Sequence, residues 1–78
     1  MTRGGHSAQV DIHLLVNGLT LSVAQLGPDF LFLNAPLDHP PAAASLVMKV
    51  DQSESRWNVQ LPKGISAGKK RVEIAAVT

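Results

Sequence analysis

The stretch VDIHLLVNGLTLSVA, residues 10–24, decides the fold. In its first half, apolar side chains occupy every second position, which is the period of a strand with one buried face. These side chains are Val10, Ile12, Leu14 and Val16. Asn17-Gly18 follows, and this dipeptide favours a two-residue type I′ turn because both residues tolerate a positive φ. The stretch therefore predicts a β-hairpin.

The register of this hairpin follows from its turn, because a two-residue loop determines which residues lie opposite each other. The predicted inward pairs are Val16 with Leu19, Leu14 with Leu21 and Ile12 with Val23. The predicted outward pairs are Leu15 with Thr20, His13 with Ser22 and Asp11 with Ala24. One face is apolar and the other is mostly polar, so turn chemistry and alternation give the same prediction.

The middle of the chain predicts two further strands around a loop. Residues 30–33, FLFL, form a short apolar run after the turn Gly27-Pro28-Asp29, and we interpret them as a strand covered on both sides. Residues 34–41 contain three prolines and predict a loop. Alternation over residues 46–50 favours a strand, whereas two prolines followed by three alanines leave a helix open for residues 42–50.

The last part of the chain predicts a second hairpin and a final strand. A four-residue loop at residues 52–55 would pair Asp51 with Arg56, Val50 with Trp57, Met48 with Val59 and Leu46 with Leu61. Residues 71–77 would close the fold with Val72, Ile74 and Ala76 facing inward. The sequence thus predicts an all-β fold, a small six-stranded antiparallel barrel or sandwich built from hairpins.

Length and composition restrict the number of domains and the expected cellular location. A chain of 78 residues has room for one small domain, which we place at residues 8–78 after a disordered tail of residues 1–7. Apolar residues at 45% and charged residues at 17% predict a folded chain, and the net charge of +1 gives no field for a polyanion. No cysteine is present, which excludes disulfides and is compatible with the cytoplasm, our expected location. Residues 12–28 lack charge but contain too many polar groups to span a membrane.

One group of side chains resembles catalytic machinery. The predicted register places Asp11, His13 and Ser22 on one face of the first hairpin. A catalytic triad also needs an oxyanion hole and a pocket, which an exposed sheet face does not provide. We interpret the group as a polar outer face and predict no enzymatic activity.

The histidines do not predict a metal site or a cofactor. His6, His13 and His39 lack the short spacing of a preformed metal site. Asp38 and His39 are expected to form hydrogen bonds within the proline-rich turn.

A basic run lies at the start of the last predicted strand. A contact patch for single-stranded nucleic acid could form from Lys63, Lys69, Lys70 and Arg71. Such surfaces usually add exposed aromatic rings, but Trp57 faces inward in the predicted register. The sequence therefore disfavours nucleic acid and indicates a solvated strand end that blunts a sheet edge.

The order of elements between residues 19 and 61 resembles the PilZ family of small six-stranded β-barrels. That family binds cyclic di-GMP through an R-x-x-x-R motif and a [DN]-x-S-x-x-G motif. Residues 22–27, SVAQLG, match the second motif only at Gly27, and Arg3 is the sole arginine before residue 56. The resemblance implies a barrel, and the sequence disfavours cyclic di-GMP as a ligand.

Several apolar residues occupy the outward positions of their predicted strands. They are Leu15, Leu26, Leu31, Leu33, Val47 and Val77. Either barrel closure covers them or a partner does, and edge pairing between two copies would satisfy both. We therefore expect a non-catalytic protein-interaction or assembly module that binds a protein partner or itself. The alternative is a small barrel that binds single-stranded nucleic acid through its basic strand end.

Overall fold

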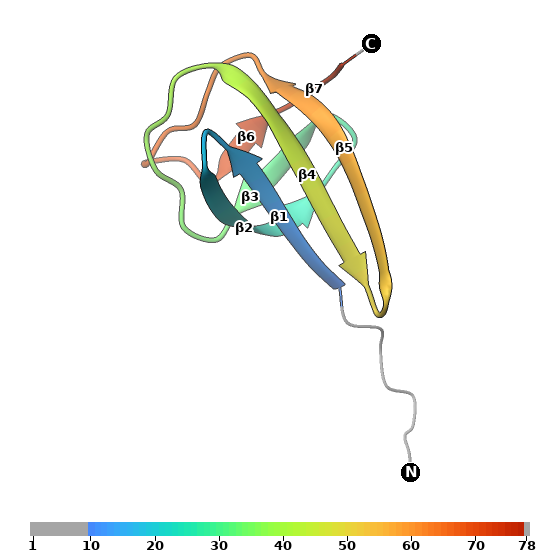
Figure 1. Ribbon diagram of the computed structural model, residues 1–78. Coiled ribbons are helices and arrows are strands. Elements are labelled where there is room, and N and C mark those ends of the chain that lie inside the picture. Colours follow the sequence, from blue (N-terminus) through green and yellow to red (C-terminus); the bar gives the residue numbers. More distant parts are fainter. Residues whose placement is uncertain (1–9, 78) are drawn as a thin grey trace.

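The computed structural model describes residues 10–77, whose strands form one seven-stranded antiparallel sheet curled into a nearly closed barrel (Figure 1). The strands are β1 (Val10–Val16), β2 (Leu19–Leu26), β3 (Phe30–Leu33), β4 (Ala42–Val50), β5 (Ser53–Leu61), β6 (Arg71–Glu73) and β7 (Ala75–Ala76). Their order in the sheet is β6-β3-β2-β1-β4-β5-β7. The predicted all-β antiparallel fold is confirmed. The predicted tail, residues 1–7, lies outside the described residues.

The first hairpin forms as predicted around its turn. Asn17 and Gly18 both adopt a positive φ, at 47° and 79°, as a type I′ turn requires. The pairs from Val16 opposite Leu19 to His13 opposite Ser22 have the predicted register. Turn chemistry therefore determines this part of the sheet.

The hairpin is shorter than predicted because the ladder between β1 and β2 ends where β2 bends. Its second half pairs with β3, and the register shifts between Val23 and Gln25 where a bulge bends the strand. The predicted pairs of Ile12 with Val23 and Asp11 with Ala24 are therefore wrong, since the ladder between β1 and β2 ends at His13 and Ser22. Among residues 10–77, the start of β1 pairs only with β4.

The second hairpin has a different register from the predicted one. Its loop contains two residues, Asp51 and Gln52, with Asp51 at a φ of 54°. Trp57 consequently lies opposite Leu46, not Val50, and Arg56 lies opposite Val47, not Asp51. Val59 and Leu61 likewise lie opposite Ala44 and Ala42. Both loop lengths are even, so each side chain still faces the predicted side.

The open choice at residues 42–50 is settled in favour of a strand. β4 begins at Ala42 and runs without interruption to Val50, so the alanines are extended. The longer β4 pairs along its whole length with β5 and over six residues with β1. These ladders outweigh the high helix propensity of alanine.

The FLFL strand is oriented opposite to the prediction. Leu31 and Leu33 are fully buried in the core, whereas Phe30 and Phe32 are half-buried on the other face. The two rings meet edge to face at 5.5 Å, and the Arg71 guanidinium lies 4.3 Å from the centre of the Phe30 ring. The larger side chains thus cover the outside of the strand.

The last predicted strand divides in two and closes the barrel. β6 pairs with β3 at one edge of the sheet, and β7 pairs with β5 at the other edge. Only Ile74 separates them, and its backbone N–H donates to the carbonyl of Asp29 at 3.0 Å. Val72 and Ile74 are buried as predicted, but Ala76 is exposed. The two edges of the sheet therefore meet at one residue.

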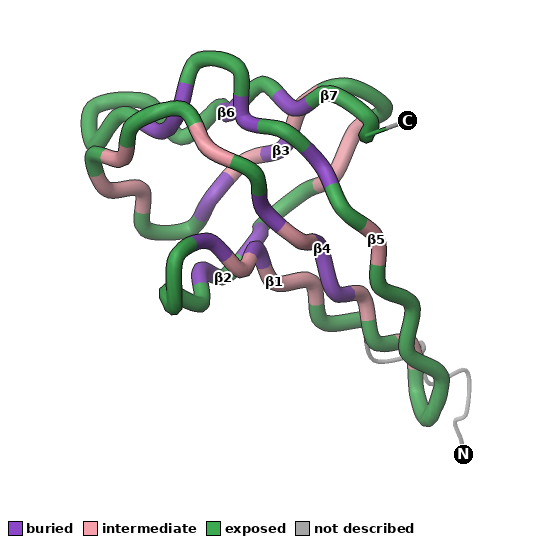
Figure 2. The backbone as a smooth tube through the Cα atoms, turned by 45° about the horizontal axis from the view of Figure 1, so that its top comes forward, coloured by how far each residue is buried: buried purple, intermediate pink, exposed green. Residues whose placement is uncertain are grey.

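The buried residues lie mainly on the strands of the barrel (Figure 2), and none of those described is polar or charged. The fully buried side chains are Leu14, Val16, Leu31, Leu33, Leu46, Leu61 and Val72. Of the apolar residues predicted to face outward, Val47 is buried, Leu15 and Leu26 are half-buried, and Val77 is exposed. The described part of the chain contains no helix long and apolar enough to cross a membrane.

Candidate functional site

The outer ends of β1, β4 and β5 extend beyond the barrel as a three-stranded arm, comprising residues 10–12 and 48–57 (Figure 1). The arm forms because β2 leaves β1 at Ser22 while β4 and β5 continue to their turn. It gives the molecule a long axis of 47 Å against 29 and 23 Å across. The arm tip is largely exposed, in contrast to the barrel (Figure 2).

One face of the arm continues the core side of the sheet and is apolar. Pairing places Val10 beside Val50 and Ile12 beside Met48, on the same side as the buried Leu14 and Leu46. We call Val10, Ile12, Met48, Val50 and Trp57 the apolar arm face. Val10 is 51% exposed, and the other four are half-buried. Contiguous apolar surface of this kind marks interaction sites more often than isolated exposed side chains do.

The outer side of β5 forms an unpaired strand edge. β7 covers β5 only at Val59 and Gln60, so no strand within residues 10–77 pairs with Ser53–Trp57 on the side away from β4. We call residues 53–57 the arm edge. Its backbone polar groups on that side can pair with another strand.

Charged side chains lie on the opposite face of the arm edge from Trp57. Glu54 lies between two cations, with Oε1 3.8 Å from Lys49 Nζ and Oε2 3.9 Å from Arg56 Nη2. All three side chains are about half exposed, at 46–60% of their surface. Solvent screens such pairs, so they contribute little to stability and leave their charge open to a partner.

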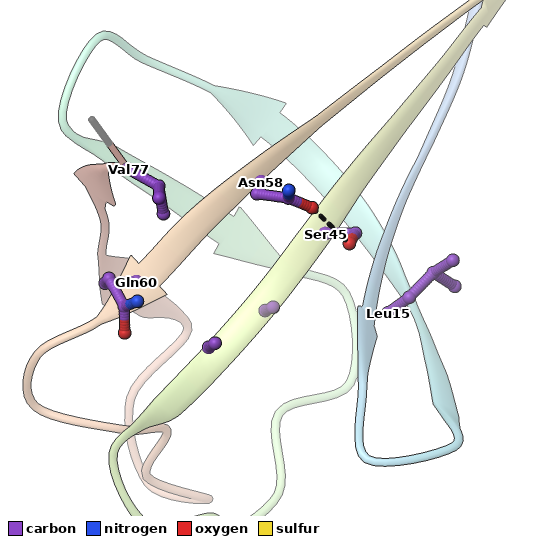
Figure 3. A pocket seen from close by; sticks show the side chains of 7 residues that line it. Leu15, Ser45, Asn58, Gln60 and Val77 are labelled. Atoms are coloured by element: carbon purple, nitrogen blue, oxygen red, sulfur yellow. Dashed lines mark hydrogen bonds between the residues drawn. The ribbon is translucent and has the colours of Figure 1, made fainter.

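A shallow hollow of about 370 Å³ lies on the outside of β4 and β5 (Figure 3). Ser45 donates a hydrogen bond to Asn58 Oδ1 at 3.0 Å across its floor, and Gln60 and Val77 lie at one end. Leu15 lines the other end. The polar groups at the floor are paired with each other, and no ionisable side chain lines the hollow. It therefore lacks the groups that general acid or base chemistry needs.

Three of the four residues of the predicted basic patch lie together. Lys63, Lys69 and Arg71 line a hollow of about 200 Å³, whereas Lys70 does not line it. Glu73 lines the same hollow and pairs with Lys63, with Nζ 3.2 Å from Oε2. The patch thus carries its own counter-charge, and the Phe30 ring holds the Arg71 guanidinium.

The triad-like group does not assemble. His13 and Ser22 are neighbours across the hairpin, but the Ser22 hydroxyl accepts a hydrogen bond from Asn34 Nδ2 at 2.8 Å. Asp11 shares a face with His13 and lies opposite Lys49 on β4. That hydrogen bond uses a lone pair of the serine oxygen, and within residues 10–77 no hydrogen bond joins the Ser22 hydroxyl to His13.

Asp38 and His39 join three loops. Asp38 Oδ1 accepts a hydrogen bond from the Ala67 N–H at 2.9 Å, a longer-range bond than the predicted one within the turn. His39 Nδ1 lies 2.7 Å from the Pro40 carbonyl, so it donates, and Nε2 accepts from Asn17 Nδ2 at 3.1 Å. No group of three or more potential metal ligands occurs within residues 10–77, and His6 lies outside that range.

The arm edge is the feature that sequence reasoning missed. The predicted four-residue loop included most of it, whereas these residues belong to β5. A signal was present, because charged residues alternate with Ser53, Ser55 and Trp57 from the turn onward. Comparison with known proteins adds no further guide: no family model, curated protein or solved structure matches the chain.

Proposed function

We propose that this domain is a non-catalytic protein-interaction or assembly module that binds through its arm. The observation that carries the proposal is the unpaired arm edge directly beside the apolar arm face. A strand added to the edge would satisfy its backbone groups, and side chains of the added strand could cover the apolar face. We also propose that the module is cytoplasmic. A chain without cysteine forms no disulfide and therefore needs no oxidising compartment.

Two other functions have weaker support. The hollow beside Ser45 lacks ionisable groups, and the Ser22 hydroxyl is bonded to Asn34, so neither favours an enzyme. The basic residues of the described chain do not form one patch for nucleic acid. Lys63 pairs with Glu73 at the basic hollow, and Lys49 pairs with Glu54 on the arm. Trp57, the largest aromatic side chain, lies on the arm and not beside the basic hollow. Stacking and phosphate contacts would thus not coincide on one face.

Photo-crosslinking in the cells that produce the chain tests this proposal. A benzophenone amino acid at Ser55, the exposed centre of the arm edge, is expected to form a protein adduct because a bound strand would lie alongside it. The adduct is identified by its mass on a denaturing gel and by peptide sequencing.

The matched control carries the same group at Thr20, which is also exposed but lies on β2 beside the first turn. Adducts from Ser55 and not from Thr20 support the proposal. Absence of adducts at Ser55, or equal yields at both positions, contradicts it, and adducts to nucleic acid favour the alternative function.

A further inference from the structure

We infer that the partner of the arm edge is a second copy of this chain, paired antiparallel about a twofold axis at Ser55. The inference rests on the proposed function and specifies its partner. Two β5 strands would join two arms into one continuous sheet, in the order β1-β4-β5-β5-β4-β1. The two barrels would then lie at opposite ends of the pair.

The length of the unpaired edge limits the position of the axis. The turn at Asp51 and Gln52 limits the edge on one side, and β7 limits it from Val59 on the other. Six residues, 53–58, have no strand partner on that side within the described chain. An axis at Ser55 pairs residues 53–57 in both copies and an axis at Arg56 pairs residues 54–58, so the length of the edge places the axis near these two residues but does not choose between them.

The charges on the arm edge select the register. Residues opposite each other must point to the same face of the joined sheet, so their residue numbers must add up to an even number. In this part of the edge, that condition allows a twofold axis at Glu54, Ser55 or Arg56. An axis at Glu54 places two carboxylates opposite each other, and an axis at Arg56 places two guanidinium groups opposite each other. Only the axis at Ser55 places Glu54 opposite Arg56 of the second copy, and it does so twice.

The register extends an alternation of charge across the sheet. Within one copy, Asp11 lies opposite Lys49, and Lys49 lies opposite Glu54. Arg56 of the second copy follows next, so the row carries a negative, positive, negative and positive charge in turn. Opposite charges on neighbouring strands stabilise a sheet, and like charges destabilise it.

The apolar arm face also matches in this register. Trp57 lies opposite Ser53 of the second copy, whose small side chain leaves room for the indole. Val50 pairs with Ser53 within each copy, so Val50 of the second copy lies in the same row as Trp57, one strand beyond Ser53. Two strand spacings are roughly 9.5 Å, so the indole approaches Val50 by lying over the small Ser53 side chain. The dimer would thus cover part of the exposed apolar face with the largest side chain of the arm.

Sedimentation velocity on the purified chain tests the dimer. Because only five residues a side pair, we expect a dissociation constant on the order of 10–100 µM, with dimer accumulating above that concentration. Glu54→Arg or Arg56→Glu places like charges opposite each other at two positions. Each variant alone is expected to dimerise at least about tenfold more weakly.

A mixture of the two variants provides the decisive result. One copy then carries two arginines on its edge and the other carries two glutamates, so both cross-strand pairs become attractive again. We expect the equimolar mixture to dimerise while each variant alone stays monomeric. This restoration also shows that both variants are folded.

The matched control is Lys63→Glu, which makes an equal charge change at an ion pair outside the arm and should leave dimerisation unchanged. A strict monomer at millimolar concentration, or a mixture that behaves as its separate components, overturns the inference. If the native chain is monomeric but Ser55 still crosslinks to a different protein, the proposed function stands and only the second copy is excluded as its partner.

Discussion

Gly18 and Gly64 show how one backbone conformation can serve two different purposes. Both have a positive φ, 79° and 67°, that side chains other than glycine rarely adopt. A Cβ at Gly18 would meet nothing within 4 Å, whereas a Cβ at Gly64 would collide with the backbone of His39, Pro40 and Pro41. Gly18 therefore serves a turn, and Gly64 also allows the proline-rich loop to pack against the loop after β5.

We predict that Gly64→Ala destabilises the fold far more than Gly18→Ala. At Gly18 the cost is that of a left-handed alanine, about 1–2 kcal/mol. At Gly64 the same cost adds to a backbone collision and to loss of the bridge between His39 and Ile65, for a total of roughly 3 kcal/mol or more. Urea unfolding of both variants measures the difference, and equal losses would show that the loop can move aside.

At the scale of the strands, alternation predicts which face a side chain lies on better than it predicts which residue lies opposite it on the neighbouring strand. Trp57 and Val59 point inward as predicted although both have different neighbours, because the predicted and observed loops are both even in length. The FLFL strand shows the opposite case, since four consecutive apolar residues carry no alternation. Which of its faces is inward was settled by packing: the aromatic rings lie against Arg71 on the outside.

Hydrogen exchange tests the description of the arm edge. β4 pairs on both sides around Leu46–Met48, so its amides should exchange slowly. In dilute solution, the amides of residues 53–57 that point away from β4 should exchange rapidly. They should become protected as the protein concentration approaches the dissociation constant of the dimer. Protection already present in dilute solution would mean that another part of the chain covers the edge.

For the whole molecule, closure of the barrel depends on one buried residue at the join of its two edges. Ile74 is 8% exposed and lies between β6 and β7, whereas Val77, three residues later, is 47% exposed. Residues 71–76 reach both edges of the curled sheet, and no helix occurs within residues 10–77. Loss of the Ile74 side chain would leave a cavity at the place where the sheet closes.

We predict that Ile74→Ala lowers the free energy of unfolding by about 2–4 kcal/mol, as truncation of a buried isoleucine does elsewhere. Val77→Ala is the matched control and should change it by less than about 0.5 kcal/mol. Chemical denaturation of the two variants under the same conditions measures both values. A small loss at Ile74 would show that the two edges close the barrel without it.

The amino-acid sequence by itself determined the fold class, the first hairpin and the face on which most strand residues lie. These features depend on turn residues such as Asn17-Gly18 and on alternation, which act between residues close in the chain. Only the tertiary structure decided where β2 leaves β1, how the last segment divides at Ile74, and which part of β5 has no partner. Those outcomes depend on pairing between distant strands that compete for the same edges, and no local pattern encodes that competition. The arm and its unpaired edge, on which the proposed function rests, are products of it.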